Sequence, residues 1–464
     1  MRAPKALILR FLLALALAAF QVFGYCECGY RAWINTNHTV AGSEAVTGEH
    51  GSFKRIHTDI DPRLVDPAFG TSYIYTDLLE TDFLHSDSIA KNTDWQIQNY
   101  SVTAAANRGK FGMEFNTANV KLNRIEDPKN WTGPGEFGGD PGLQMSVESN
   151  VTTAGFTLCA QINSARQDMM DGTFRALIKL PPVSGTCSAF FWYHNDSEEI
   201  DMELLSSQFN RNKDEFLVNL VHQSTQSAAQ GFSVIGKDYQ VVSLPVDPTS
   251  GFHEYRIDYT DGIILFYIDS LVIGAMNSTK PDVPGHLILT QWSNGDPGWS
   301  GGPPVAPAVL SVGYVKAYFN SSDPVRQGDA ERRCNDPSEP GAVCYIEDYR
   351  PPANITSLVN NLQIPALDTP FFSNRENMTN NQTVYRSDGN TCQEGNFLRP
   401  IGSLIMVWFF LSLLRLLFKL LDILVDYIHG DEAADRYDVE AAGCGFEALD
   451  TWSAILEAEV EDVA

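Results

Sequence analysis

The chain has 464 residues, of which 44% are hydrophobic and 19% are charged, a composition that allows one or two full-sized domains and excludes a largely disordered protein. Its 58 acidic and 32 basic residues give a formal net charge of −26 at pH 7. Such a surface repels phosphate backbones, so we expect no nucleic-acid partner.

Residues 1–24 have the pattern of a secretory signal peptide. Arg2, Lys5 and Arg10 precede an apolar run over residues 11–20, and small residues follow near a plausible cleavage point. The alternative is an uncleaved membrane anchor, which the run disfavours because it is shorter than the roughly 20 residues that a span needs. The pattern therefore predicts export through the secretory pathway.

Asn-X-Ser/Thr sequons are frequent before residue 400 and do not occur after it. Each sequon alone is weak evidence, but ten of them behind a signal peptide indicate that residues 26–400 are lumenal or extracellular. We expect a protein of the cell surface or the extracellular space. The acceptor residues are Asn37, Asn99, Asn130, Asn150, Asn195, Asn277, Asn320, Asn354, Asn377 and Asn381.

Seven cysteines lie in the part expected to be exported, a compartment in which disulfides form and persist. Spacing alone does not give their connectivity; Cys159–Cys187 and Cys334–Cys344 are the pairs that we expect, and the odd number leaves one free thiol. The early Cys-X-Cys run fits no common zinc pattern, and we expect neither a metal nor a cofactor. The seven are Cys26, Cys28, Cys159, Cys187, Cys334, Cys344 and Cys392.

Short alternating segments and turn signals fill the chain up to about residue 320, without a long stretch of helical periodicity. This pattern is typical of an all-β sandwich or barrel. The clearest hairpin joins residues 253–259 to residues 263–269 through Asp261-Gly262, a pair that supplies the positive φ of a tight turn. Further strands are predicted over residues 173–180, 187–193, 199–205, 215–222, 285–292 and 308–319.

The C-terminal part of the chain changes character. Residues 321–400 are rich in Asn, Pro, Ser and Thr and predict a glycosylated, partly disulfide-tied stalk. Residues 401–428 predict one transmembrane helix if Arg415 and Lys419 snorkel to the headgroups; an amphipathic helix lying on the membrane is the alternative. The acidic residues 429–464 would then be a cytoplasmic tail.

Three acidic residues alternate along one predicted strand. Because alternate side chains of a strand share a face, Glu199, Asp201 and Glu203 project together. Their mutual repulsion should raise at least one carboxyl pKa, a cost that a purely structural strand has no reason to carry. An exposed acidic face is the alternative. Cleavage of a glycosidic bond needs one carboxylate as nucleophile or base and one carboxylic acid to protonate the leaving oxygen.

The run from Glu199 to Glu203 resembles the catalytic Glu-X-Asp-X-Glu signature of glycoside hydrolase family 16, which includes β-glucanases and cell-wall transglycosylases. The likeness extends over roughly residues 70–320, and the run of residues 26–30 resembles a fungal branch of the family. Further matching segments are residues 172–181, 252–259 and 289–295.

The resemblance implies a concanavalin-like β-jelly roll over residues 25–320 and a retaining double displacement. It implies that Glu199 is the nucleophile, that Glu203 is the general acid/base, and that Asp201 assists the nucleophile. The implied substrate is β-1,3- or mixed-linkage β-glucan of the cell wall. Hydrolysis and transglycosylation stay open as outcomes, and a lectin-like binding protein on the same sandwich would predict loss of at least one of the carboxylates.

Four residues are candidates for contact with the polysaccharide. Trp292 and Trp299 could stack on sugar faces, although buried core tryptophans are as common. Trp192, in the strand before the acidic one, is a third candidate. His222 alternates with core residues on a predicted strand, so it either faces the substrate or is a core histidine.

Overall fold

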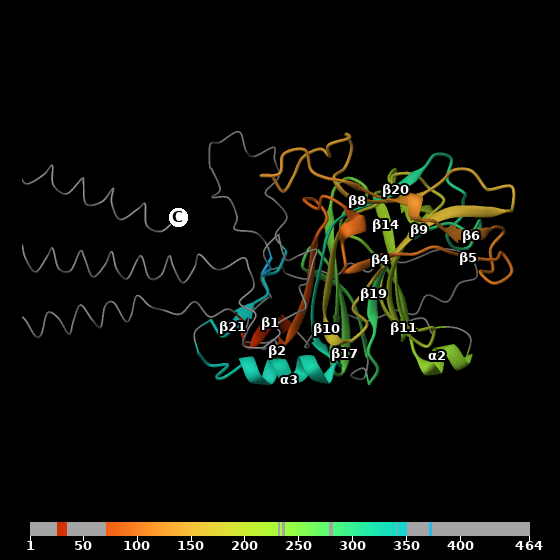
Figure 1. The fold of residues 1–464 in the computed structure, drawn as a ribbon. Coiled ribbons are helices and arrows are strands. Elements are labelled where there is room, and N and C mark those ends of the chain that lie inside the picture. Colours follow the sequence, from red (N-terminus) through yellow and green to blue (C-terminus); the bar gives the residue numbers. More distant parts are fainter. Residues whose placement is uncertain are drawn as a thin grey trace, which may run out of the picture. The chain divides into compact units, whose positions relative to one another are not determined.

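The computed structural model describes residues 26–34, 71–230, 233, 237–277, 282–339, 341–349 and 371–373. All of them belong to the first of two compact units, Met1–Ser387; the second, Asp388–Ala464, lies outside the described residues. The described residues form two large sheets packed face to face (Figure 1), so the predicted all-β sandwich is confirmed.

The first large sheet is antiparallel throughout. Its strands are β3 (Asp77–Asp82), β7 (Val120–Asn123), β8 (Gly142–Val147), β10 (Met169–Lys179), β16 (His253–Tyr259), β17 (Ile263–Ile268), β18 (Leu271–Asn277) and β20 (Ala308–Ser321). They are ordered β18-β17-β16-β10-β20-β8-β7, and β3 also pairs with β20.

The second large sheet is antiparallel except where β6 pairs with β9. Its strands are β4 (Trp95–Ile97), β5 (Tyr100–Val102), β6 (Gly112–Phe115), β9 (Phe156–Ser164), β11 (Cys187–Asn195), β12 (Glu198–Leu205), β13 (Phe209–Asn210), β14 (Glu215–Gln223), β15 (Tyr239–Ser243) and β19 (His286–Trp292). They are ordered β13-β14-β12-β11-β19-β9-β6-β5, with β15 beside β14 and β4 beside β9.

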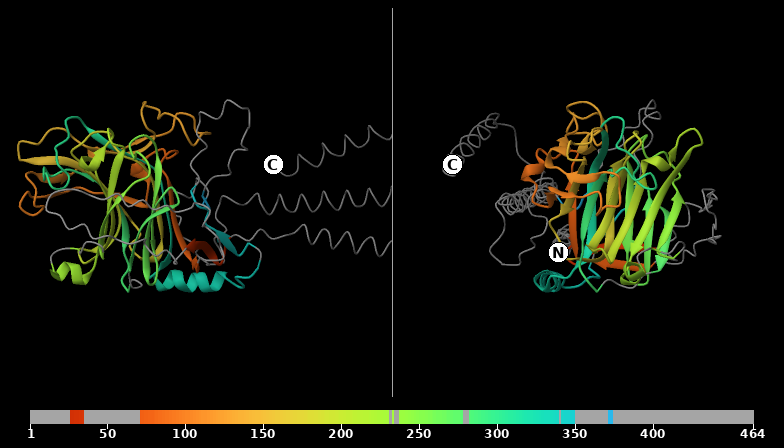
Figure 2. Two further views of the ribbon diagram at one scale, coloured as in Figure 1. Left: turned by 180° about the vertical axis from the view of Figure 1, so that it is seen from behind. Right: turned by 90° about the vertical axis from the view of Figure 1, so that its right-hand side faces the viewer.

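The described helices are short and lie outside the two sheets (Figure 2). They are α2 (Thr225–Gln230), α3 (Pro324–Arg333) and the 3₁₀ turns η2 (Ile89–Lys91), η3 (Thr117–Asn119) and η4 (Ser206–Gln208). Every predicted strand is present, with its ends shifted by a few residues. The predicted hairpin is β16–β17, and Gly262 in its turn has a φ of 91°.

The hydrophobic core lies between the two large sheets. Phe174 of the first sheet and Phe190 of the second are both fully buried there. Trp192 belongs to the same core, and its Nε1 donates to the Met169 carbonyl at 3.2 Å. The expectation that Trp192 contacts substrate is therefore wrong. Gly285 accommodates its indole, because a Cβ at that position would lie 2.3 Å from the ring.

A third, smaller sheet covers part of the outer face of the first. It consists of β1 (Gly29–Ile34), β2 (Thr71–Tyr75) and β21 (Val343–Tyr345), ordered β2-β1-β21. Tyr30 of β1 stacks at a tilt on Tyr318 of β20, with ring centroids 5.6 Å apart, and both side chains are buried. The small sheet thus has an apolar contact of its own with the sandwich.

Two disulfides fasten the small sheet. They join Cys26 to Cys344 and Cys28 to Cys334, so the expected Cys334–Cys344 pair is wrong. The reason is the parallel pairing of β21 with β1, which places Cys344 beside Tyr30 at the start of the described chain. Sequence spacing does not reveal a contact between segments that lie more than 300 residues apart.

The expected Cys159–Cys187 disulfide is also wrong, since both thiols are free and buried. Cys159 lies on β9 and Cys187 on β11, and β19 runs between these two strands. Two strand spacings amount to about 9–10 Å, whereas a disulfide needs Cα atoms closer than about 7 Å.

The folded domain extends past residue 320, where a stalk was expected to begin. Asp323 caps α3 by accepting from the backbone N–H of Val325 at 2.8 Å. Residues 341–349 and 371–373 return to the sandwich, and the backbone N–H of Ser373 donates to Glu80 of β3 at 2.8 Å. A stalk remains an expectation only for the residues outside these described segments.

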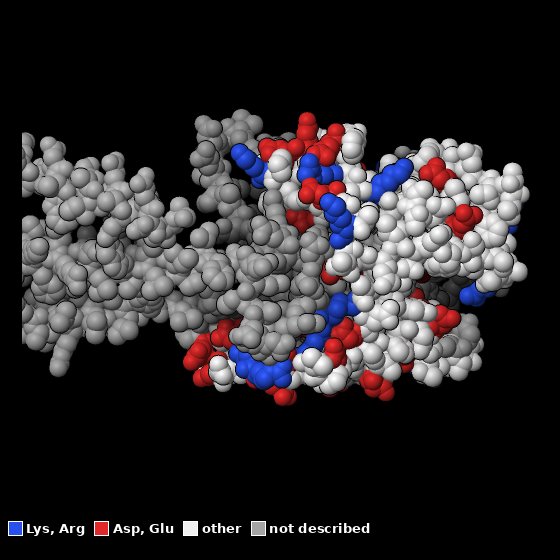
Figure 3. All heavy atoms as spheres, viewed as in Figure 1, with Lys and Arg blue, Asp and Glu red and all other residues white. Residues whose placement is uncertain are grey.

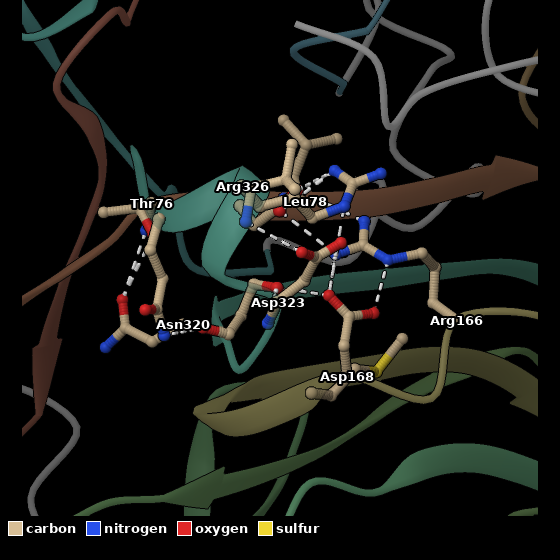
Figure 4. Close-up of polar contacts among 12 residues, drawn as sticks. Thr76, Leu78, Arg166, Asp168, Asn320, Asp323 and Arg326 are labelled. Carbon is tan, nitrogen blue, oxygen red and sulfur yellow. Dashed lines mark hydrogen bonds and ion pairs between the residues drawn. The ribbon is translucent and has the colours of Figure 1, made fainter. Parts of the chain in front are cut away.

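Charged side chains tie α3 to the first sheet (Figure 4). Arg166 contacts Asp168 at 2.6 Å and Asp77 at 3.0 Å, and Arg326 of α3 contacts Asp77 at 3.1 Å. The Arg166 guanidinium and the hydrogen bond from Ser321 hold the pKa of Asp168 below its ordinary value, against the effect of burial. The cluster fixes the position of α3 after the last strand.

Six of the ten sequons fall on described residues. Asn320 is half-buried, and its Nδ2, the atom to which a glycan would be attached, donates to Asp171 at 3.0 Å. A glycan at Asn320 stays an expectation, because an amide nitrogen that carries a sugar keeps one N–H to donate. The exposed acceptors are Asn99, Asn130, Asn150, Asn195 and Asn277, whereas Asn37, Asn354, Asn377 and Asn381 lie outside the described residues.

Within the described ranges, no helix is long and apolar enough to cross a membrane. The predicted signal peptide (1–24), membrane helix (401–428) and acidic tail (429–464) all lie outside those ranges.

Candidate active site

Strand β12 lies between β11 and β14 in the middle of the second large sheet. Its apolar residues alternate into the core, so its other face carries the three carboxyls. Glu199, Asp201 and Glu203 line one cleft, as predicted. Asp201 is only 5% exposed, and the two glutamates are half-buried. The alternation along β12, with its apolar residues in the core, thus places three acidic side chains together in a site that is partly shielded from water.

The cleft has a volume of about 450 Å³ and crosses the strands. Each strand from β15 through β14, β12, β11, β19, β9 and β6 to β5 contributes a lining residue. Neighbouring strands are about 4.8 Å apart, so these seven spacings cover about 34 Å. The lining residues are Tyr100, Met113, Phe115, Gln161, Ala189, Phe191, Glu199, Asp201, Glu203, Val221, Gln223, Ser233, Tyr239, Thr290, Trp292 and Trp299.

The pKa of Glu199 is raised to about 7. Burial is the largest cause, a hydrogen bond with Asp201 acts against it, and the nearby charges of Glu203 and Asp196 act in the same direction as burial. Gln223 Nε2 also donates to Glu199 Oε2 at 3.4 Å. The charge of Glu203, on the same strand, is thus close enough to raise the pKa of Glu199.

Asp201 has the strongest reason of the three to be neutral. Burial raises its pKa well above the ordinary value, the charges of Glu199 and Glu203 act in the same direction, and so does the hydrogen bond to Glu199. A protonated Asp201 donates that hydrogen bond. It therefore stabilises a negative charge on Glu199, and the three groups titrate as one coupled set.

Glu203 is held by two donors at a single oxygen. Trp299 Nε1 donates to Glu203 Oε1 at 3.3 Å, and Cys187 Sγ donates to the same atom at 3.6 Å. Burial raises the pKa of Glu203, and both hydrogen bonds act against that effect. Trp299 comes from the loop after β19, so the structure brings this predicted residue to the site from a distant part of the chain.

Aromatic rings line the cleft on one side of the carboxyls. Trp292, the last residue of β19, is half-buried there, as predicted. Tyr100 and Phe115 stack with their centroids 4.7 Å apart, and Tyr100 Oη donates to Gln161 Oε1 at 2.9 Å. A flat apolar ring with polar groups at its edge is a surface that suits a sugar.

His222 does not lie in the cleft, so the expectation that it contacts substrate is wrong. It is paired with Ile200 of β12, and residues paired across two strands share a face. Ile200 faces the core, on the side opposite the carboxyls. Burial lowers the pKa of His222, against a smaller effect of Asp238.

Several cleft residues were not predicted from the sequence. Phe191 was within reach of prediction, because it alternates with the core residue Trp192 on β11. Tyr100, Phe115 and Gln161 lie on β5, β6 and β9, strands that were not predicted. Among the described residues, no group of three or more His, Cys, Asp or Glu side chains is placed to hold a metal ion.

Comparison with known proteins identifies the domain. Residues 96–305 match the sequence model of glycosyl hydrolases family 16, which confirms the resemblance noted from the acidic strand. That segment includes β12 and all of the residues that line the cleft.

Parts of the chain are similar to curated proteins from bacteria, plants and yeast. The chain is 26% identical to the beta-glucanase of Paenibacillus macerans, over 26% of this chain and 48% of that protein. It is 30% identical to the probable xyloglucan endotransglucosylase/hydrolase protein 27 of Arabidopsis thaliana, over 34% of this chain and 50% of that protein. It is 23% identical to Congo red hypersensitive protein 1 of Saccharomyces cerevisiae, over 29% of this chain and 26% of that protein. The chain thus spans about half or less of these relatives.

Proposed function

Because the chain carries a domain of glycoside hydrolase family 16, we propose that it is a retaining glycosidase that cleaves β-1,3- or mixed-linkage β-glucan through a glycosyl-enzyme. The observation that carries the proposal is the row of three carboxyls on the floor of a cleft that crosses the sheet. The proposal takes the roles that the resemblance implies: Glu199 as nucleophile, Asp201 as the residue that assists it, and Glu203 as acid/base.

The proposed reaction has two displacements. In the first, a Glu199 oxygen attacks the anomeric carbon, the glycosidic bond breaks, and Glu203 gives its proton to the leaving oxygen. In the second, Glu203 takes a proton from water, the water oxygen attacks the same carbon, and the Glu199 ester bond breaks. Each displacement inverts the anomeric centre, so the product keeps the configuration of the substrate.

The electrostatics of the cleft support this division of roles. Burial raises the pKa of Glu203, which favours its protonated form as the acid of the first step. The hydrogen bond from Asp201 lowers the pKa of Glu199 relative to burial alone. That hydrogen bond therefore stabilises the ionised form of Glu199, the nucleophile.

The shape of the cleft supports an extended substrate. A groove that crosses the sheet suits a linear chain of sugars better than a compact metabolite. The relative from Paenibacillus macerans is named a beta-glucanase, which favours β-glucan as the polymer. No cofactor takes part in either displacement.

Transfer to a sugar hydroxyl is the second candidate outcome. The Arabidopsis relative is named both an endotransglucosylase and a hydrolase. The two reactions share the glycosyl-enzyme on Glu199 and differ in whether water or a sugar hydroxyl attacks it. The proposal includes both, with hydrolysis as the reaction to be tested first.

We further propose that the domain works outside the cytosol. The disulfides Cys26–Cys344 and Cys28–Cys334 support this location, because such bonds persist in oxidising compartments. N-terminal sequencing of the secreted protein tests the location. A chain that begins near residue 25 is expected, whereas an intracellular chain that begins at Met1 would contradict it.

The test of activity uses laminarin, barley mixed-linkage glucan and a labelled chitin-oligomer acceptor, with reducing ends and product lengths measured. Shortened glucans that disappear with Glu199→Gln are expected for a hydrolase. Lengthened or hybrid chains that disappear with the same variant would show a transglycosylase. Glucan binding without turnover by the unmodified protein would overturn the enzyme proposal and favour a lectin-like function.

A further inference from the structure

Cys187 lies beneath the acid/base of the proposed reaction. It begins β11, is fully buried, and shares the cleft face with Ala189, which is paired directly with Glu203. Ala189 has only a methyl group, so the Glu203 side chain can reach diagonally to Cys187. From this contact, we propose that Cys187 is a positioning residue that orients the Glu203 carboxyl by donating a hydrogen bond to its Oε1.

The two oxygens of Glu203 have different surroundings. Oε1 accepts from Cys187 Sγ at 3.6 Å and from Trp299 Nε1 at 3.3 Å. In the part of the chain that the structure describes, no hydrogen bond is made to Oε2. With both donors occupied at Oε1, Oε2 is the oxygen that carries the transferable proton toward the substrate.

The thiol is suited to donate and not to act as a nucleophile. Burial raises the pKa of Cys187 well above its ordinary value, and the negative charge of Glu203 adds to that effect. The group therefore keeps its proton. Other titratable groups near Glu203 are Asp201 and Glu199 on its own strand and Tyr239 on β15, whose pKa burial and the charge of Glu203 raise to about 12.

Cys159 provides a matched control. It is also a free, fully buried thiol on the cleft side of the same sheet. Its Sγ donates to backbone carbonyls, those of Thr157 at 3.5 Å and Ser293 at 3.8 Å. It therefore shares the chemistry and burial of Cys187, but its hydrogen-bond partners are Thr157 and Ser293 and not a catalytic carboxyl.

The test compares Cys187→Ala, Cys187→Ser and Cys159→Ala in the full-length protein. For each variant, kcat, KM and the pH profile of kcat/KM are measured on the glucan that the unmodified protein cleaves. The thiol stabilises ionised Glu203, so its removal should raise that pKa. For Cys187→Ala we expect the alkaline limb to move up by about half a pH unit and kcat to fall about three- to tenfold, with KM unchanged within about twofold.

Cys187→Ser keeps a donor and should restore most of kcat and the position of the alkaline limb, while Cys159→Ala should change neither. Equal effects of Cys187→Ala and Cys159→Ala, or no rescue by serine, would overturn the inference. If Cys187→Ala does not fold, Cys187→Val, which fills the space without a donor, replaces it.

The inference rests on the proposed function. Turnover by the unmodified protein tests that function, and the differences among the variants test the positioning role of Cys187.

Discussion

Glu198 and Glu199 are neighbours in the chain, but β12 turns their side chains to opposite faces. Glu199 lies in the cleft, whereas Glu198 accepts a hydrogen bond from Thr225 at 3.3 Å outside it. We expect Glu199→Gln to lower kcat at least about 10³-fold, because it removes the nucleophile, and Glu198→Gln to change it by less than about twofold. Reducing-end assays measure both. Similar losses in the two variants would contradict the assignment.

The raised pKa of Glu199 also affects stability. Between the ordinary value of 4.5 and about 7, the folded state binds more protons at this group than the unfolded state does. The free energy of unfolding therefore falls as the pH rises through that window. Glu199→Gln removes this loss, so we expect its Tm to exceed that of the unmodified protein by roughly 3–6 °C at pH 8 and to match it at pH 4.

Thermal unfolding of both proteins at the two pH values measures the effect. A stabilisation of equal size at pH 4 and pH 8 would show that its cause is not the titration of Glu199.

The acidic row was predictable because it depends only on the alternation within one strand. Trp192 and His222 were assigned wrongly because the face of a residue on a neighbouring strand also depends on register. Register pairs both Trp192 and His222 with Ile200, and hence with the core. The role of Cys187 was not predictable either, since its contact with Glu203 is diagonal across two strands.

At the scale of elements, Gly285, the residue just before β19, lets the backbone pass close to the indole of Trp192. A Cβ there would lie 2.3 Å from the ring, whereas one at the loop residue Gly251 would contact nothing within 4 Å. We expect Gly285→Ala to lower the free energy of unfolding by about 1–3 kcal/mol and Gly251→Ala to change it by less than about 0.5 kcal/mol. Denaturant unfolding measures both; equal effects would contradict this account of the packing.

The long strands from β10 onward were predicted well because each has an apolar face and turn residues at its ends, whereas the nine-residue β9 was missed. The short strands β4, β5 and β6, of three or four residues each, carry too few alternations to be recognised. Of these, β5 and β6 line one end of the cleft, so part of the aromatic wall was missed with them. Helix α3 was missed because the residues after 320 were interpreted from their composition alone.

Over the whole molecule, two disulfides connect the start of the described chain to the segment after the last long strand. They close loops of 318 and 306 residues and hold the small sheet on the sandwich. We expect Cys28→Ser/Cys334→Ser to lower the free energy of unfolding by about 2–5 kcal/mol. Thermal unfolding should show a lower Tm for this variant and for the reduced protein, while Cys159→Ser should respond to reduction as the unmodified protein does.

An unchanged Tm after reduction, with both disulfides shown to be open, would contradict the role of the small sheet in stability. The connectivity could not be predicted from the sequence, because it depends on which distant segments become neighbours when the sheets form.

The distribution of surface charge is also a property of the whole fold. Figure 3 shows acidic and basic side chains interspersed on one face of the described residues, despite the net charge of −26.

The central claim is that Glu199 forms a covalent bond with the sugar in a retaining reaction. The most direct measurement uses a 2-deoxy-2-fluoro β-glucosyl fluoride of suitable chain length, followed by protease digestion and mass spectrometry. We predict one glycosyl group per chain, on the peptide that contains Glu199 and on that residue, and no label in Glu199→Gln. Label on Glu203, or glucan cleavage with an inverted anomer as the first product, would contradict the account.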